Sequence, residues 1–214
     1  MCASPTVRIR HERPEDYRRT EELAREAFWN RYRPGALEHA IIHRLRTHPD
    51  FLPDLSFVLD IDGVVEGGIF TSRSRLITQG GIVPTVTFGP VFLAPARQGQ
   101  GFGRMLITQV LRQARTQDFA AVLILGHPQH YRSYGFRGGK TCGISLSDGT
   151  FPVCLLALPL HEGALTRQGH VVFSPALEMQ DRDADAFDAG FPFKEKHVLP
   201  CQRIFEELCA MTDT

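Results

Sequence analysis

The spacing of hydrophobic and polar residues predicts one strand and two helices near the start of the chain. Val7 to Arg10 alternates apolar and charged residues, which is typical of a short strand with one buried face. Pro14 suits the first turn of a helix, and we expect that helix to run to about Phe28. A second helix is predicted where Leu37, Ile41 and Leu45 recur at helical spacing.

The clearest turn signal in the chain is Asp62-Gly63, because both residues tolerate the positive φ angles of a tight turn. Two β-rich runs, Ser56 to Ile61 and Val64 to Phe70, flank this dipeptide and are predicted to pair as a hairpin. Gly80-Gly81 then interrupts the pattern before a further strand, Thr85 to Leu93.

Strands and helices alternate from Thr85 onward. A glycine-rich turn leads into a helix predicted from about Gly101 to Thr116, and a short helix is predicted near Gln129 to Tyr134. Ala120 to Leu125 is a continuous apolar run, as expected of a strand covered on both faces. Two more strands are predicted, near Cys142 to Leu146 and Val153 to Leu158. This order predicts an α/β fold with a mixed, twisted sheet and flanking helices.

The composition changes towards the C-terminus, so we divide the chain into a domain of residues 1–165 and a C-terminal extension of residues 166–214. The extension ends in an amphipathic helix whose apolar positions are Ile204, Phe205, Leu208 and Met211. We expect this stripe to dock on the same domain or on a sister subunit, which would make a homodimer.

Charge and cysteine content narrow the function classes. Lys plus Arg equals Asp plus Glu at 24 each, so no global positive field attracts nucleic acid or an anionic membrane. No window approaches the roughly 18 apolar residues that a membrane span needs. Five cysteines without a C-x-x-C pair, and an N-terminus without an apolar stretch, favour reduced thiols in a cytoplasmic protein. The scattered histidines show no metal-ligand spacing, so no metal is expected.

Candidate chemistry concentrates in the segment from Val91 to Gly103, where a strand ends, a turn carries three glycines and a helix begins. Glycines let a backbone approach a ligand closely and turn several N–H groups towards one point. The new helix adds its unpaired N–H donors and the positive end of its dipole. This combination predicts an anion site suited to a pyrophosphate.

The spacing of the glycines separates the families that use such a turn. A dinucleotide fingerprint G-x-G-x-x-G would need glycine at Arg104 or Leu106, and a Walker A loop ending at Gly139-Lys140-Thr141 would need glycine at Tyr134. A calcium loop beginning at Asp181 lacks its glycine and its glutamate. The pattern that does fit is Q/R-x-x-G-x-G/A, formed by Gln98, Gly101 and Gly103.

This pattern resembles the pyrophosphate loop of the GNAT superfamily of acetyl-CoA-dependent N-acetyltransferases. The second signature of that family, an aromatic-rich helix of form Y-x-x-x-G-F, is matched by Tyr131 and Gly135-Phe136. The two signatures stand in the family's order, each in its structural context. The looser resemblance extends from about Val7 to Leu158, and beyond about Gln180 nothing matches.

The resemblance implies a twisted sheet splayed at the strand that binds acetyl-CoA. Pro90 supports a splayed or bulged strand independently, because proline cannot donate a ladder hydrogen bond. Backbone groups of one run of residues would then pair with the pantetheine arm, and amides of a second run would receive the pyrophosphate. The first run is Val91, Phe92 and Leu93, and the second is Gln98, Gly99, Gln100, Gly101, Phe102 and Gly103.

The resemblance also gives Tyr131 the role of protonating the departing CoA thiolate, while Tyr134 is assigned to the core. The general base stays open between Glu66, His127, His130 and water. The activity implied is direct transfer of an acetyl group from acetyl-CoA to a primary amine, of a small molecule or of a peptide, in a ternary complex, because no Ser or Cys is marked as a nucleophile. Two alternatives remain: a non-catalytic acyl-CoA sensor on the same fold, and a nucleotide-binding module that uses the Gly99 to Gly103 turn.

Overall fold

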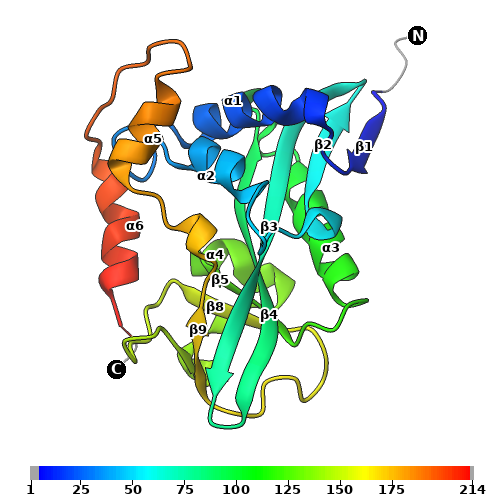
Figure 1. The fold of residues 1–214 in the computed structure, drawn as a ribbon, viewed down its shortest axis with the longest axis vertical. Coiled ribbons are helices and arrows are strands. Elements are labelled where there is room, and N and C mark those ends of the chain that lie inside the picture. The colour runs from blue at the N-terminus through cyan, green and yellow to red at the C-terminus, as the bar shows by residue number, and fades with distance from the viewer. Residues whose placement is uncertain (1–4, 213–214) are drawn as a thin grey trace.

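The computed structural model describes residues 5–212, so Cys2 lies outside the described residues. Nine strands of this part of the chain form one mixed sheet (Figure 1). Their bounds are β1 (Val7–Arg10), β2 (Phe57–Ile61), β3 (Val64–Thr78), β4 (Gly81–Leu93), β5 (Ala121–Leu125), β6 (Arg137–Gly138), β7 (Ile144–Ser145), β8 (Leu155–Pro159) and β9 (Gly169–Val172). The central order is β1-β2-β3-β4-β5-β8-β6, and β9 pairs with both β3 and β7.

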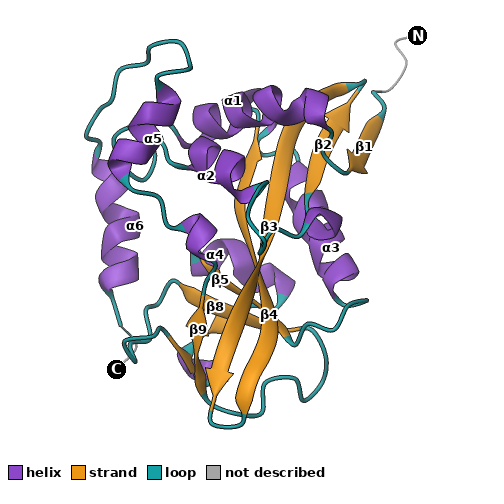
Figure 2. Cartoon of the chain, viewed as in Figure 1, coloured by secondary structure: helices purple, strands orange, loops and turns teal. Residues whose placement is uncertain are grey.

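Helices cover both faces of the sheet because successive strand residues point to opposite sides. On β2, Phe57 and Leu59 share a hydrophobic core with helix α3 (Phe102–Ala114). Val58, between them, belongs to a second core. That core contains residues of α1 (Tyr17–Phe28) and α2 (Glu38–Leu45). Figure 2 shows α1 and α2 separated from α3 by the strands. The predicted mixed α/β fold is confirmed.

Strands β3 and β4 form a long antiparallel hairpin with one irregularity. Ile69 pairs with Val91, and Thr71 pairs with Phe88. Two residues of β4, Gly89 and Pro90, therefore lie opposite a single residue of β3, Phe70. This extra residue is a β-bulge, a feature that bends a strand and increases its twist. Proline fits here because a bulge leaves a backbone position outside the ladder.

Strands β4 and β5 begin as a parallel pair and then diverge. Their ladder consists of Thr85 with Ala121 and Val86 with Val122. Strand β5 stays paired with β8 as far as Leu125, whereas β4 continues along β3 to Leu93. The edge of β4 after Val86 therefore faces an opening in the sheet, which is the splayed geometry expected from Pro90.

The segment predicted as a C-terminal extension contributes to the sheet and also crosses the end of α1. Strand β9 pairs with Arg75–Thr78 of β3. Helices α5 (Asp181–Asp188) and α6 (Pro200–Ala210) follow, at the left of Figure 1. Arg25 of α1 donates to Asp188 at 2.5 Å, and the rings of Tyr32 and Phe205 lie 4.8 Å apart.

The amphipathic stripe of α6 is divided between two environments. Phe205 and Leu208 are half-buried against the chain, whereas Ile204 and Met211 are each 60% exposed. Phe205 and Leu208 therefore lie on the face that docks on this domain. Among the described residues, none of the helices has the length and apolar content needed to cross a bilayer.

Candidate active site

The loop between β4 and α3 has the open backbone that an anion site needs. Gly99 and Gly101 adopt φ angles of 74° and 86°, in the left-handed region that favours glycine. A Cβ atom added to either residue would meet no protein atom within 4 Å. Gly101 is the N-cap of α3, so the first N–H groups of the helix lack intrahelical partners beside this open space.

Glu66 of β3 fastens this loop. Its backbone oxygen accepts from the Ala94 N–H at 2.8 Å, and its carboxylate accepts from the Arg97 guanidinium at 3.1 and 3.2 Å. Arg19 of α1 forms a second ion pair with the same carboxylate, at 3.4 Å. Glu66, a candidate base from the sequence, is thus engaged by two arginines and lines neither of the two cavities described below.

A narrow cavity of about 310 Å³ runs from this loop along the free edge of β4. Its lining includes five of the predicted cofactor residues, Val91, Phe92, Leu93, Gln98 and Gly103. Gly99, Gln100 and Gly101 lie in the exposed loop beyond them. The Phe102 side chain packs against the core, so only its backbone N–H, in the first turn of α3, is positioned for an anion.

Tyr131 closes helix α4 (Pro128–Tyr131), which follows β5 directly. Its ring contacts the rings of Phe88, at 5.9 Å between centroids, and Phe136, at 5.6 Å. Burial raises the pKa of the Tyr131 phenol to about 12, so it stays protonated at neutral pH. Tyr134, assigned to the core from the sequence, packs on the core and also lines the narrow cavity.

A second, larger cavity of about 550 Å³ lies on the other side of Tyr131. Its lining includes residues of β4, the end of β5, α2, α4 and the C-terminal segment, together with Phe28 and Tyr32. Five residues line both cavities: Phe28, Tyr32, Val91, His130 and Tyr131. The two cavities therefore adjoin at these five residues, one of which is Tyr131.

Two buried polar atoms in the larger cavity have no hydrogen-bond partner among the described residues. They are Thr87 Oγ1 on β4 and Nδ1 of His127, at the start of α4. Buried polar atoms are normally paired, so these two are suited to a ligand. His127 and His130 have their rings 5.1 Å apart. Burial, together with His127 and Arg31, lowers the pKa of His130, which favours its neutral form.

Glu38 is a further candidate, which sequence reasoning missed. It is the first residue of α2, and its half-buried side chain lines the larger cavity. Burial raises its pKa to about 7, although the Leu37 N–H donates to its Oε2 at 3.0 Å. A carboxylate with this pKa can hold an ammonium group or accept its proton near neutral pH.

The α2 pattern explains why Glu38 was missed. A carboxylate in the first turn of a helix is expected from the helix dipole alone, so it carries no functional signal. The fully buried α2 residues include Ile42 and Leu45, whereas Ile41 of the predicted stripe is half-buried and lines the larger cavity. The helix therefore has one face on the core and one on the cavity. Within residues 5–212, no cluster of three or more His, Cys, Asp or Glu is placed to hold a metal ion.

The sequence and the fold are similar to those of known acetyltransferases. The acetyltransferase (GNAT) family model matches residues 15–136. The GNAT family N-acetyltransferase YhbS from Escherichia coli, solved in complex with CoA, is 24% identical with a TM-score of 0.72, over 82% of this chain and 94% of that chain. A GNAT family acetyltransferase from Brucella melitensis, solved with acetyl-CoA, is 28% identical with a TM-score of 0.65, over 81% and 99%. No protein with a curated description matches the sequence.

The region matched by the family model makes up more than half of the chain. It contains the β4–α3 loop, the diverging strands and the helix that carries Tyr131. The prediction of the family from Gln98, Gly101, Gly103 and the Tyr131 signature is confirmed. This protein is a member of the acetyltransferase (GNAT) family.

Proposed function

We propose that this protein transfers an acetyl group from acetyl-CoA directly to a primary amine in a ternary complex, with Tyr131 as the general acid. The observation that carries the proposal is that Tyr131 lines both cavities. A donor in the narrow cavity and an acceptor in the larger one would bring their reacting atoms together there, with a phenol beside them.

The donor side is supported by the loop and by the free edge of β4. Open space at Gly99 and Gly101 suits a pyrophosphate, and unpaired backbone groups between Thr87 and Leu93 suit the amides of a pantetheine arm. The solved structures with CoA and acetyl-CoA are consistent with this use of the fold.

The chemistry requires one nucleophilic attack and balanced proton movements. The neutral amine nitrogen attacks the thioester carbonyl carbon, and the C–S bond then breaks. The nitrogen loses a proton to water as the amide forms, and the CoA thiolate receives a proton from the Tyr131 phenol. The raised pKa of the Tyr131 phenol keeps this proton on the ring until the thiolate forms. The phenolate left on Tyr131 then regains a proton from water.

A covalent acyl-enzyme is disfavoured by the cavity walls. No Ser or Cys is present in the described lining of either cavity. The free thiols of the described chain, Cys142, Cys154, Cys201 and Cys209, lie outside both linings. Direct transfer needs no such nucleophile.

The substitution Tyr131→Phe tests the proposal because it keeps the ring contacts and removes the proton donor. Acetyl-CoA affinity, measured by calorimetry, should stay unchanged. The kcat for amine-dependent CoA release should fall by roughly 10²- to 10⁴-fold, the usual effect of losing a general acid. An unchanged kcat would show that Tyr131 only packs beside the donor. A wild type that binds acetyl-CoA but acetylates no amine would favour the sensor.

A further inference from the structure

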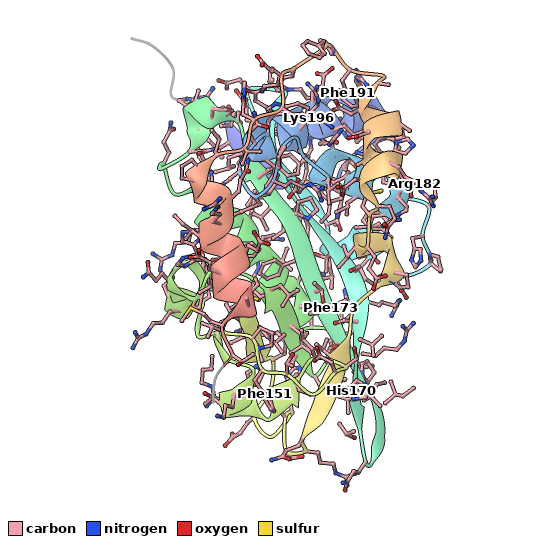
Figure 3. The ribbon with its side chains drawn as sticks, turned by 90° about the vertical axis from the view of Figure 1, so that its left-hand side faces the viewer. Phe151, His170, Phe173, Arg182, Phe191 and Lys196 are labelled. Carbon is pink, nitrogen blue, oxygen red and sulfur yellow. The ribbon has the colours of Figure 1, made fainter. Side chains whose placement is uncertain are left out.

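The walls of the larger cavity are mostly carbon. Aromatic and aliphatic side chains reach it from four segments that are far apart in the sequence. They include Phe88 of β4, Leu125 of β5, Leu146, and the C-terminal residues Phe173, Leu177 and Phe205. Figure 3 labels Phe173 just beyond the end of β9. An occupant of this cavity must therefore present an apolar surface to most of its wall.

The larger cavity has few acidic and imidazole groups, and its two acids differ in how deeply they are buried. Glu38 and Glu178 are its two acids, and His127 and His130 its two imidazoles. Glu178 is exposed at the rim, so water and salt screen its charge. Glu38 is half-buried, and the neighbouring cation that acts on it, Arg33, lines neither cavity. The interior of the cavity thus offers one carboxylate to a cationic ligand.

Unpartnered polar atoms add a second, independent indication of a ligand. Thr87 is only 6% exposed, and its Oγ1 has no hydrogen-bond partner among the described residues. Nδ1 of His127, the residue before α4, also lacks a partner among the described residues. Both residues line the larger cavity, as Tyr131 does.

These features select among amine acceptors. A polyamine or an aminoglycoside would place several charges against carbon walls, which is costly without partners. A free amino acid would bring its carboxylate into the same small cavity as Glu38, and like charges at short range repel in a low dielectric. A compact amine with one charge and an apolar body has neither conflict.

We propose that the acceptor is a monocationic primary amine on an apolar body of aromatic size, with its ammonium group towards Glu38 and its body against Phe173, Leu177 and Phe205. The inference rests on the proposed function and names the acceptor class of the same site. Glu38 acts here as a binding residue that contacts the substrate nitrogen.

The first experiment compares acceptors at one acetyl-CoA concentration, by amine-dependent CoA release and mass detection of the amide. Phenethylamine and hexylamine should exceed spermidine and free phenylalanine by at least about tenfold in kcat/KM, within the discrimination of apolar pockets. Faster acetylation of spermidine or of phenylalanine would overturn the acceptor class and leave the proposed function intact. Acetyl-CoA binding with no amide from any amine would instead overturn the proposed function.

The second experiment uses Glu38→Gln, which keeps the size of the side chain and removes its charge. The KM for phenethylamine should rise about 10- to 100-fold, as expected for losing a bond to a charged group, with acetyl-CoA affinity unchanged. Glu206→Gln is the matched control, because Glu206 is exposed on α6 and lines neither cavity. An unchanged KM in Glu38→Gln would overturn the docking of the ammonium group on Glu38.

A third comparison asks whether the apolar walls hold an acyl chain instead of the acceptor. Phe205→Ala should weaken the use of phenethylamine about tenfold and leave that of ethylamine unchanged, because only the larger body reaches this wall. Hexanoyl-CoA should not bind more tightly than acetyl-CoA to the wild type. Tighter hexanoyl-CoA binding that Phe205→Ala abolishes would assign the cavity to the acyl chain and overturn the proposal.

Discussion

The ring of Tyr131 lies against Gly126, so closely that a Cβ atom on residue 126 would come within 2.5 Å of Cε2 in that ring. The substitution Gly126→Ala should therefore displace Tyr131 while leaving its phenol intact. We expect kcat to fall by about 10- to 100-fold, because small misplacements of a reacting group cost this much, and acetyl-CoA affinity to change little. Steady-state kinetics and calorimetry on the purified variant check both expectations.

Gly190→Ala provides the control for this variant. A Cβ atom at Gly190 would have its nearest neighbour, the Phe187 oxygen, at 3.4 Å, and Gly190 lines neither cavity. Its kcat should match the wild type. Equal losses in the two variants would mean that the effect comes from general destabilisation and not from the position of the Tyr131 ring.

Gly101→Asp should abolish acetyl-CoA binding and leave the fold in place. The new carboxylate would enter the open space beside the first turn of α3, where it repels phosphate. Gly163→Asp is a matched control, since Gly163 has a similar positive φ of 73°, equally open surroundings and no place in either cavity. Both variants should lose about 1 kcal/mol of stability from the backbone alone. Wild-type affinity in Gly101→Asp would show that the loop is not the donor site.

Glu38 should make the protein less stable as the pH rises. Burial raises the pKa of this carboxyl from its usual 4.5 to about 7. Below pH 4.5 the group is neutral in both states, and between pH 4.5 and 7 the unfolded chain ionises first. The free energy of unfolding therefore falls through this window, by at most about 3 kcal/mol, and Glu38→Gln removes the fall.

Thermal unfolding of wild type and Glu38→Gln at pH 4.5 and pH 8 checks this expectation. The variant should have the higher Tm at pH 8 and a similar Tm at pH 4.5. A variant that is less stable at both values would show that the Glu38 carboxylate stabilises the fold, contrary to its raised pKa.

His39 should produce the opposite dependence on the acid side. It is fully buried between Phe187 and Phe191, and burial lowers its pKa from 6.5 to about 4, although Asp188 Oδ1 lies 3.0 Å from Nε2. Below pH 6.5 the His39 imidazole is protonated in the unfolded chain, whereas in the folded protein it stays neutral down to about pH 4. The free energy of unfolding should fall by at most about 3 kcal/mol as the pH drops through this window.

Urea unfolding at pH 7 and pH 4.5 measures this loss. The free energy of unfolding at pH 7 minus that at pH 4.5 should be lower in His39→Gln than in wild type, by at most about 3 kcal/mol, because the variant keeps the opposite contribution of Glu38. His161→Gln, at an exposed histidine, should keep the wild-type difference. If His39→Gln also keeps it, the acid sensitivity of the protein originates at other groups.

Local sequence patterns were sufficient for the elements that position the donor. The glycines at residues 99, 101 and 103 allow the backbone to approach a ligand closely. The continuous apolar run at Ala121–Leu125 is typical of a strand that is covered on both faces. Pro90 predicted an irregular strand, and the structure has a β-bulge at Gly89-Pro90 and a separation of β4 from β5 after Val86. Each of these features depends on residues that are adjacent in the sequence, so a local pattern is enough to predict it.

The proposed acceptor side could not be predicted from the sequence, because it depends on pairings between distant segments. Strand β9 is only four residues long and contains a glycine, yet it pairs with Arg75–Thr78, nearly a hundred residues earlier. Phe205 was recognised as part of a docking stripe, but not as a cavity wall, because its partner Tyr32 lies at the other end of the chain. Glu38 was indistinguishable from an ordinary helix-start carboxylate.

The divergence of β4 and β5 also divides the molecule into two halves that can change separately. Residues 91–136 supply the loop, α3 and the Tyr131 helix, whereas the far walls of the larger cavity come from residues 38–41 and 173–205. Under the proposed function, variation in α2 and α6 would redirect the enzyme to new acceptors while the donor chemistry is inherited unchanged. A combinatorial library confined to Ile41, Leu177 and Phe205 would explore this freedom directly, because none of these three side chains lines the narrow cavity.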